Sequence, residues 1–179
     1  NLGNALKNSG DDWVEDAVAS YRQALELAPD YALAHWNLSL ALLSLGDYKE
    51  GFAEMAWRWQ WTGFPARRRE FEQPHWTGPG NDAGKDVGIS NDNKEGKRIL
   101  LHAEQGLGDT LHFMRYAAVV KALGMQVIFE CPAALVPLVG GTDLVDELIL
   151  PGDPLPAFEC HAALLDLPNL CDTTAETIP

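Results

Sequence analysis

The sequence predicts a two-part fold, in which all-α helical repeats precede an α/β segment with a parallel sheet. An internal repeat covers the first sixty or so residues, and short apolar runs alternate with amphipathic stretches from residue 98 onward. A stretch rich in Gly, Asn, Asp and Lys, without hydrophobic periodicity, separates the two. Because such a composition is typical of exposed loops, we expect repeats at 1–62, a linker at 63–97 and the α/β segment at 98–179.

The charge of the chain disfavours some classes of partner. The 179 residues carry a formal net charge of −13, which disfavours nucleic acid and anionic membrane surfaces. No apolar run approaches the roughly 20 residues that span a bilayer, so we expect no membrane span and a cytoplasmic protein. The sequence starts inside a repeat at Asn1, without an initiator methionine or a signal peptide, so we expect it to be part of a longer protein.

The cysteines and the basic residues predict little chemistry. Cys131, Cys160 and Cys171 are odd in number and lack CxxC spacing, which favours buried apolar thiols in a reducing compartment over a disulfide scaffold or a metal site. The basic run ARRRE, residues 66–70, fits a solvated linker or a cap on nearby carboxylates, with a phosphate or an acidic partner as the alternative. The stretch Pro74, His75 and Trp76 fits a docked patch within the linker, and we assign no chemistry to His75.

The repeat consists of matching residues 36 positions apart. The matching pairs are Leu2 with Leu38, Ala5 with Ala41, and Gly10 with Gly46. Apolar residues at three- and four-residue spacing predict a helix over residues 14–27 that ends before Pro29. A second helix is expected over residues 31–45, capped by Asp30 and ended by Gly46 in a left-handed conformation.

This pattern resembles the tetratricopeptide repeat family, in which each unit is a pair of helices. The family positions matched in the first unit are Leu2, Gly3, Ala17, Tyr21, Ala24 and Pro29. The second unit departs from the pattern at Ser39, Gly51 and Arg58. Because small residues at such positions let helices approach closely, we expect the second unit to pack differently and to act as a capping repeat.

The resemblance implies that the repeats bind peptides. Asn1 and Asn37 occupy equivalent positions. In the repeats of O-linked N-acetylglucosamine transferases, an asparagine there lines a concave groove and holds peptide backbone. An amide suits that task because it both donates and accepts hydrogen bonds. The alternative is a pair of solvent-facing asparagines.

A third helix is expected over residues 48–61. Its stretch MAWRWQW brings Trp57, Trp59 and Trp61 close together in sequence. These large side chains fit a hydrophobic seam against the next domain, with ligand stacking as the alternative.

The second segment alternates strands with helices. Buried strands are expected at 98–104, 125–132, 147–150 and 162–165, and helices at 110–124 and, made irregular by a proline, at 133–141. This alternation predicts βαβ units in a parallel sheet, with the loops after the strands on one rim, where ligands bind. His102 and Glu104 would share one face of the first strand.

The loop QGLGD, residues 105–109, follows the first predicted strand. That position binds phosphate in doubly wound folds. However, Leu111 replaces the third glycine of a dinucleotide fingerprint, and Asp109 with Thr110 replaces the Lys-Ser/Thr of a P-loop. The loop is therefore predicted to be a tight turn that presents Asp109, either as a helix cap or as a catalytic group.

The stretch RILLHAEQGLGDTLHFMRYAAVVKALG, residues 98–124, resembles the opening of glycosyltransferase family 9, the heptosyltransferase group. The order of repeats, tryptophan-rich helix and this stretch resembles bacterial proteins in which tetratricopeptide repeats are fused to such a domain. The resemblance implies the N-terminal, Rossmann-like half of a GT-B fold. It also implies that Asp109, which follows Gly108 in the family's Gly-Asp motif, takes the proton of the acceptor hydroxyl as general base.

Five further residues near Asp109 are expected to contact the substrate. They are Gly106, Gly108, His102, Glu104 and His112. For His102 and His112 the alternative is a structural role.

Two functions follow as hypotheses. In the first, the chain is the front portion of a repeat-fused glycosyltransferase that moves a sugar from a nucleotide-sugar donor to a glycan or protein acceptor, which the repeats recruit. The donor half of such an enzyme is not expected within these residues, so this portion alone is expected to be inactive and to hold no cofactor or metal. In the second, the chain is a non-catalytic repeat scaffold that binds peptides or proteins.

Overall fold

The computed structural model describes residues 13–80 and 96–179, so the residues before Trp13, Asn1 among them, lie outside the described part. The chain forms two compact units. One consists of Asn1–Arg68 with Asp172–Ile178, and the other of Arg69–Cys171 with Pro179. Within the described ranges, no helix has the length and apolar character needed to cross a membrane.

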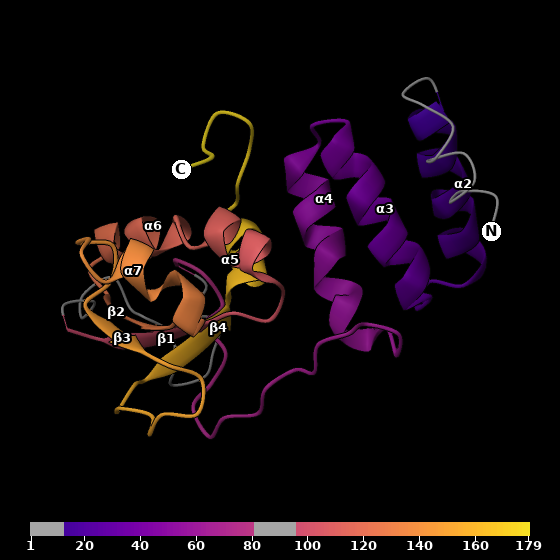
Figure 1. Ribbon diagram of the computed structural model, residues 1–179. Helices are drawn as coiled ribbons and strands as arrows, with labels where there is room; N and C mark the ends of the chain where they lie inside the picture. The colour runs from indigo at the N-terminus through magenta and orange to yellow at the C-terminus, as the bar shows by residue number, and fades with distance from the viewer. Residues whose placement is uncertain (1–12, 81–95) are drawn as a thin grey trace. The chain divides into compact units, whose positions relative to one another are not determined.

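The helical unit is built from α2 (Val14–Leu27), α3 (Ala32–Ser44), α4 (Tyr48–Met55) and the 3₁₀ helix η2 (Ala56–Gln60). Helix α3 packs against both α2 and α4 (Figure 1). The three predicted helices are present, although the third becomes 3₁₀ after Met55.

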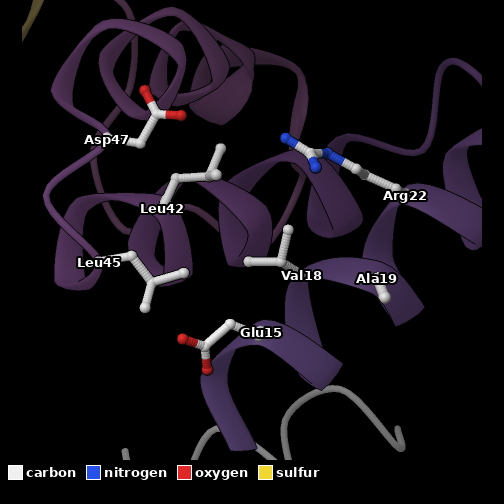
Figure 2. Close-up of a pocket in the computed structure, with 7 residues that line it drawn as sticks. All are labelled: Glu15, Val18, Ala19, Arg22, Leu42, Leu45 and Asp47. Carbon is white, nitrogen blue, oxygen red and sulfur yellow. The ribbon is translucent and has the colours of Figure 1, made fainter.

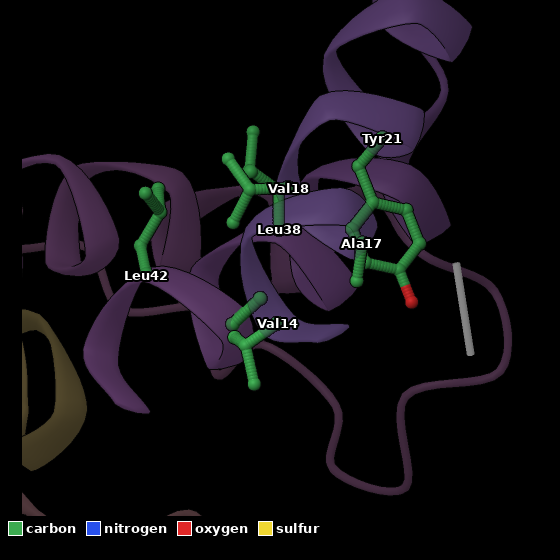
Figure 3. Packing of buried hydrophobic residues seen from close by; sticks show 7 residues of the cluster. Val14, Ala17, Val18, Tyr21, Leu38 and Leu42 are labelled. Carbon is green, nitrogen blue, oxygen red and sulfur yellow. The ribbon is translucent and has the colours of Figure 1, made fainter. Parts of the chain in front are cut away.

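The core between α2 and α3 follows the spacing that predicted the helices. Apolar residues three and four positions apart lie on one face of each helix, and there they are buried. The buried cluster, most of which is labelled in Figure 3, contains Val14, Ala17, Val18, Tyr21, Leu38, Ala41 and Leu42. Full burial of each large apolar side chain is worth roughly 1.5–3 kcal/mol, so this interface supplies much of what holds the two helices together.

The sequence predicted the residue that ends α3 but not the residue at its start. Gly46 has φ +83°, the left-handed conformation expected after α3. Asp30 does not cap α3: the cap position is Tyr31, which makes no side-chain cap bond. Because α3 begins at Ala32, Asp30 lies one residue too early. Asp47 instead caps α4, where its Oδ1 accepts a hydrogen bond from Glu50 N at 3.2 Å.

The departures from the repeat pattern are all buried. A Cβ on Gly51 would lie 2.8 Å from Leu43, so the close approach of α4 to α3 needs a glycine. Ser39 Oγ donates to the carbonyl of Trp36 at 2.8 Å. The fully buried Arg58 places its guanidinium 4.4 Å from the centre of the Trp59 ring.

Trp36, Trp57, Trp59 and Trp61 contact aromatic rings of the same unit. Trp57 stacks on His35 with ring centres 3.9 Å apart. Phe64 lies 5.4 Å from Trp36, 5.6 Å from Trp59 and 6.5 Å from Trp61.

The second unit contains a four-stranded parallel sheet, as predicted, and is consistent with a Rossmann-like fold. Strands β1 (Arg98–His102), β2 (Gln126–Glu130), β3 (Glu147–Ile149) and β4 (Cys160–Ala163) have the order β3-β2-β1-β4. Strand β1 ends two residues before the predicted end, and β4 begins two residues before the predicted start.

The helix predicted over residues 110–124 is two helices, α5 (Leu107–Phe113) and α6 (Tyr116–Ala122). The backbone tightens between them, because Ala117 N bonds to Met114 O and Ala118 N to Arg115 O, three residues back. The apolar stripe continues through this break, so the sequence does not reveal it. The irregular helix predicted over 133–141 is η3 (Ala133–Leu135) followed by α7 (Val136–Val139). After β4 come η4 (Leu164–Asp166) and α8 (Leu167–Leu170).

Part of the predicted linker packs onto the sheet. Phe71 contacts the buried cluster of Leu100, Ile128, Ile149 and Phe158. Trp76 N donates to His161 O at 2.8 Å and His161 N to Pro74 O at 3.1 Å, which extends the sheet at the β4 edge. Trp76 is buried, so these residues form the docked patch rather than an exposed loop. The sequence predicted a docked patch here but not its backbone pairing with β4, because the average composition of 63–97 is that of a loop.

Candidate functional site

The loop after β1 lies where the strand order of the sheet reverses. Strands β2 and β3 follow β1 on one side, whereas β4 lies on the other. In open α/β sheets, ligands bind at the carboxyl ends of the strands at this reversal. Helix α5 begins there and contacts η4, the segment after β4.

The turn into α5 is tight. Gly106 is its N-terminal cap residue, and both the backbone N and the Oγ1 of Thr110 donate to Gly106 O at 3.0 Å. Neither Gly106 nor Gly108 has positive φ, and a Cβ on either would meet nothing within 4 Å. The local backbone therefore does not require these glycines. They leave bare, exposed main chain at the predicted substrate site.

Asp109 is exposed and is the third residue of α5. The cap position belongs to Gly106, and no side chain caps the helix, so the interpretation of Asp109 as a helix cap is wrong. The helix starts earlier than expected and takes Asp109 into its first turn. A carboxylate there is still favoured by the helix dipole.

His112 lies on α5 one turn after Asp109 and is exposed. Arg115 Nη2 donates to His112 Nε2 at 3.0 Å. Partial burial and the charge of Arg115 lower the pKa of His112, and Asp109 opposes this shift. Of the residues predicted to contact substrate, the structure thus brings Asp109 and His112 into electrostatic contact.

His102 lies elsewhere. It is the last residue of β1 and is buried against Phe71 and His161, with ring centres 5.6 Å from each. Burial, followed by the charge of Arg69, lowers the pKa of His102 to about 3. Glu104 is half-buried in the loop beyond β1, so the prediction that it shares a strand face with His102 is wrong, because the strand ends first.

Of the side-chain contacts in this unit that the sequence did not predict, two involve acidic residues at or just after the ends of strands. His75 Nε2 bonds to Asp166 Oδ2 at 2.9 Å, although His75 was assigned no chemistry. Arg69, from the basic run, pairs with the buried carboxylate of Glu130 at the end of β2. The one signal in the sequence for the second pair was Glu130, an acidic residue at the end of the apolar run of a buried strand.

Metal and thiol chemistry find no support in the described part of the chain. No group of three or more His, Cys, Asp or Glu there is arranged to hold a metal ion. All three cysteines are free thiols, with Cys131 and Cys160 buried and Cys171 half-buried. Burial raises the pKa of Cys160 to about 12 and that of Cys171 to about 11, so both stay protonated and unreactive near neutral pH.

On the helical unit, Asn37 is buried rather than solvent-facing. Its Nδ2 is inaccessible and has no hydrogen-bond partner among the described residues. A buried amide donor without a partner is unfavourable, which makes this position unusual within α3. Its equivalent, Asn1, lies outside the described residues.

The same unit has an open cavity of about 370 Å³ between α2, the end of α3 and the turn into α4 (Figure 2). Val18 and Leu42 contribute apolar surface, and Glu15 and Asp47 place their carboxylates on either side of Leu45. The complete lining is Glu15, Val18, Ala19, Arg22, Leu42, Leu45 and Asp47.

Comparison with protein families supports the repeat. A family described as a TPR repeat matches residues 3–46 of the chain. The N-terminal region therefore contains a tetratricopeptide repeat. Comparisons with curated proteins and with solved structures gave no match.

Proposed function

We propose that the helical unit is a scaffold that binds a protein or peptide partner. The observation that carries this proposal is the cavity of about 370 Å³ on a repeat of a family built from stacked helix pairs. Ligand sites typically occupy about 300–1,000 Å³ and combine apolar walls with a few polar groups. The cavity has both features. Its lining residues come from the first helix pair of the predicted repeat and from the second.

Peptides selected from a displayed random library on the 179-residue chain test the proposal. Ala19 is exposed at the cavity, so Ala19→Met fills the cavity without removing a core contact. We expect this variant to weaken the selected peptides about tenfold or more, which corresponds to about 1.4 kcal/mol. Ala53→Met, at an exposed position of α4 outside the cavity, is the matched control. Failure to select any peptide, or equal binding by the Ala19→Met variant, contradicts the proposal.

The finer hypothesis that Asn37 holds peptide backbone remains a prediction. Because Asn37 Nδ2 is inaccessible, binding there requires the packing around this side chain to open. The same selected peptides distinguish the two positions: loss of binding in Asn37→Leu, with Asn169→Leu on α8 as control, assigns the contact to Asn37. Unchanged binding removes Asn37 from the site.

Glycosyl transfer is the second candidate function of the protein. One observation favours it: Asp109 is exposed on the first turn after β1, at the reversal of the strand order. A general base at that rim could take a proton from an acceptor hydroxyl. In the longest natural form of the protein, assayed with a panel of nucleotide sugars, Asp109→Asn should abolish transfer and leave the thermal unfolding midpoint unchanged. Transfer that persists in the variant excludes this role.

A further inference from the structure

The cavity on the helical unit carries unbalanced negative charge. Arg22, which also lines it, is already engaged, since its Nη2 lies 2.9 Å and 2.7 Å from the two carboxylate oxygens of Glu50. Neither Glu15 nor Asp47 forms an ion pair within residues 13–80 and 96–179, although the charge of Asp47 also acts on Arg22. Asp47 uses one oxygen, Oδ1, to cap α4. With Arg22 balanced by Glu50, two negative charges remain at the rim.

The surface between these charges is apolar. Val18 and Leu42 are buried side chains of the helix interface, and Leu45 remains 43% exposed. Figure 2 shows the Glu15 and Asp47 carboxylates on either side of Leu45. A long apolar stem could lie on these residues while its charged end meets a carboxylate.

Other occupants fit less well. An acidic side chain would be repelled by Glu15 and Asp47. A purely apolar one would cover the carboxylates without pairing them, which is costly. The volume, about 370 Å³, is at the small end of ligand sites and suits one long side chain. Lysine and arginine have the required form, an aliphatic stem that packs on apolar surface and a cationic end.

We propose that this cavity takes a lysine or arginine side chain from a segment of the partner protein. The inference rests on the proposed function of the helical unit and specifies the chemistry that its partner presents. It assigns the apolar contacts to Val18, Leu42 and Leu45 and the charge contacts to Glu15 and Asp47.

Three short peptides that differ in one side chain test the proposal. The probes are acetyl-Gly-Ala-X-Ala-Gly-amide with lysine, norleucine or glutamate as X, titrated into the ¹⁵N-labelled 179-residue chain. We expect the lysine peptide to bind with a dissociation constant on the order of 1 mM and to shift the amide signals of Val18, Ala19 and Leu45. Equal binding of the norleucine peptide, or no shift with the lysine peptide, overturns the proposal.

Charge-neutral variants locate the cationic end. Glu15→Gln with Asp47→Asn removes both rim charges, and asparagine keeps the cap on α4. We expect this pair of substitutions to weaken the lysine peptide about tenfold, since both carboxylates that could pair with its ammonium group are then neutral. Asp16→Asn with Glu26→Gln changes the net charge equally at exposed positions outside the cavity and should have little effect. Equal weakening by the two double variants overturns the proposal.

The outcomes separate the two proposals. One outcome refutes the lysine site and leaves the scaffold proposal standing: the displayed peptides depend on the cavity but contain no basic residue, and the lysine peptide causes no amide shifts. Failure of both the displayed library and the probe refutes both.

Discussion

At the scale of single residues, His102 links burial to pH dependence. Desolvation lowers its pKa to about 3 in the folded chain, against about 6.5 for an ordinary histidine. Between these values the unfolded chain binds a proton at this position that the folded chain does not. The contribution of His102 to the free energy of unfolding is therefore most favourable above about pH 6.5 and becomes less favourable as the pH drops towards 3.

Replacing His102 should remove this component of the pH dependence. Between about pH 7 and pH 4.5, we expect wild type to lose about 2–3 kcal/mol more unfolding free energy than His102→Leu. Urea unfolding of wild type and variant at the two pH values measures this difference. The contribution of the carboxylates is the same in both proteins and cancels when they are compared. His112→Leu serves as the control: the pKa of His112 is also lowered, but the side chain is exposed, so this substitution should remove a much smaller part of the pH dependence than His102→Leu does. Parallel losses in wild type and His102→Leu would refute the assignment.

The Arg69–Glu130 pair makes a second prediction at this scale. Glu130 is 6% exposed, so Arg69→Met would leave a buried carboxylate without its counter-charge. We expect a loss of about 2 kcal/mol in urea unfolding, below the full cost of breaking a buried pair because the Arg69 side chain is 35% exposed.

Two further substitutions complete that comparison. Adding Glu130→Gln should restore part of the loss, because it removes the uncompensated charge. Arg67→Met or Arg68→Met, at exposed positions of the same basic run, should change stability by less than about 0.5 kcal/mol. An equal effect at Arg67 would show that the buried pair is not the cause.

At the scale of helices, two glycines should respond oppositely to the same substitution. Alanine is favoured over glycine in a helix by roughly 1 kcal/mol. Gly108 in α5 has open space where a Cβ would lie, so Gly108→Ala should stabilise by up to about 1 kcal/mol. At Gly51 in α4 the Cβ would meet Leu43 at 2.8 Å, so Gly51→Ala should destabilise by about 1–3 kcal/mol. Thermal unfolding measures both, and stabilisation by Gly51→Ala would contradict the tight packing of α3 and α4.

Most of the secondary structure could be predicted because the signals are local. Three- and four-residue spacing located α2 and α3, and the apolar runs located β1, β2 and β3. The break between α5 and α6 was missed because Met114 continues the apolar stripe through it. The cap of α3 was misplaced because Asp30 is a good cap residue, yet the helix begins too late for it to act.

At the scale of the whole chain, the parts missed from the sequence are contacts between distant residues. His75 and Asp166 are 91 residues apart, and Arg69 and Glu130 are 61 apart. No local periodicity identifies such pairs. The predicted substrate site is split because its residues lie on different elements. Asp109 and His112 lie together on helix α5, whereas His102, at the end of β1, faces Phe71.

The two compact units should also respond separately to core substitutions. The cluster around Leu38 consists of residues from α2 and α3, and the cluster around Ile128 of residues from the sheet unit. Leu38→Ala should destabilise its own unit by about 2–5 kcal/mol, because it removes a buried side chain and leaves a cavity. Hydrogen exchange should then show lost protection in α2, α3 and α4 and unchanged protection in β1 and β2. Ile128→Ala should give the converse pattern. If either substitution lowers protection equally in both sets of elements, the chain unfolds as one cooperative body and the division into two units has no energetic meaning.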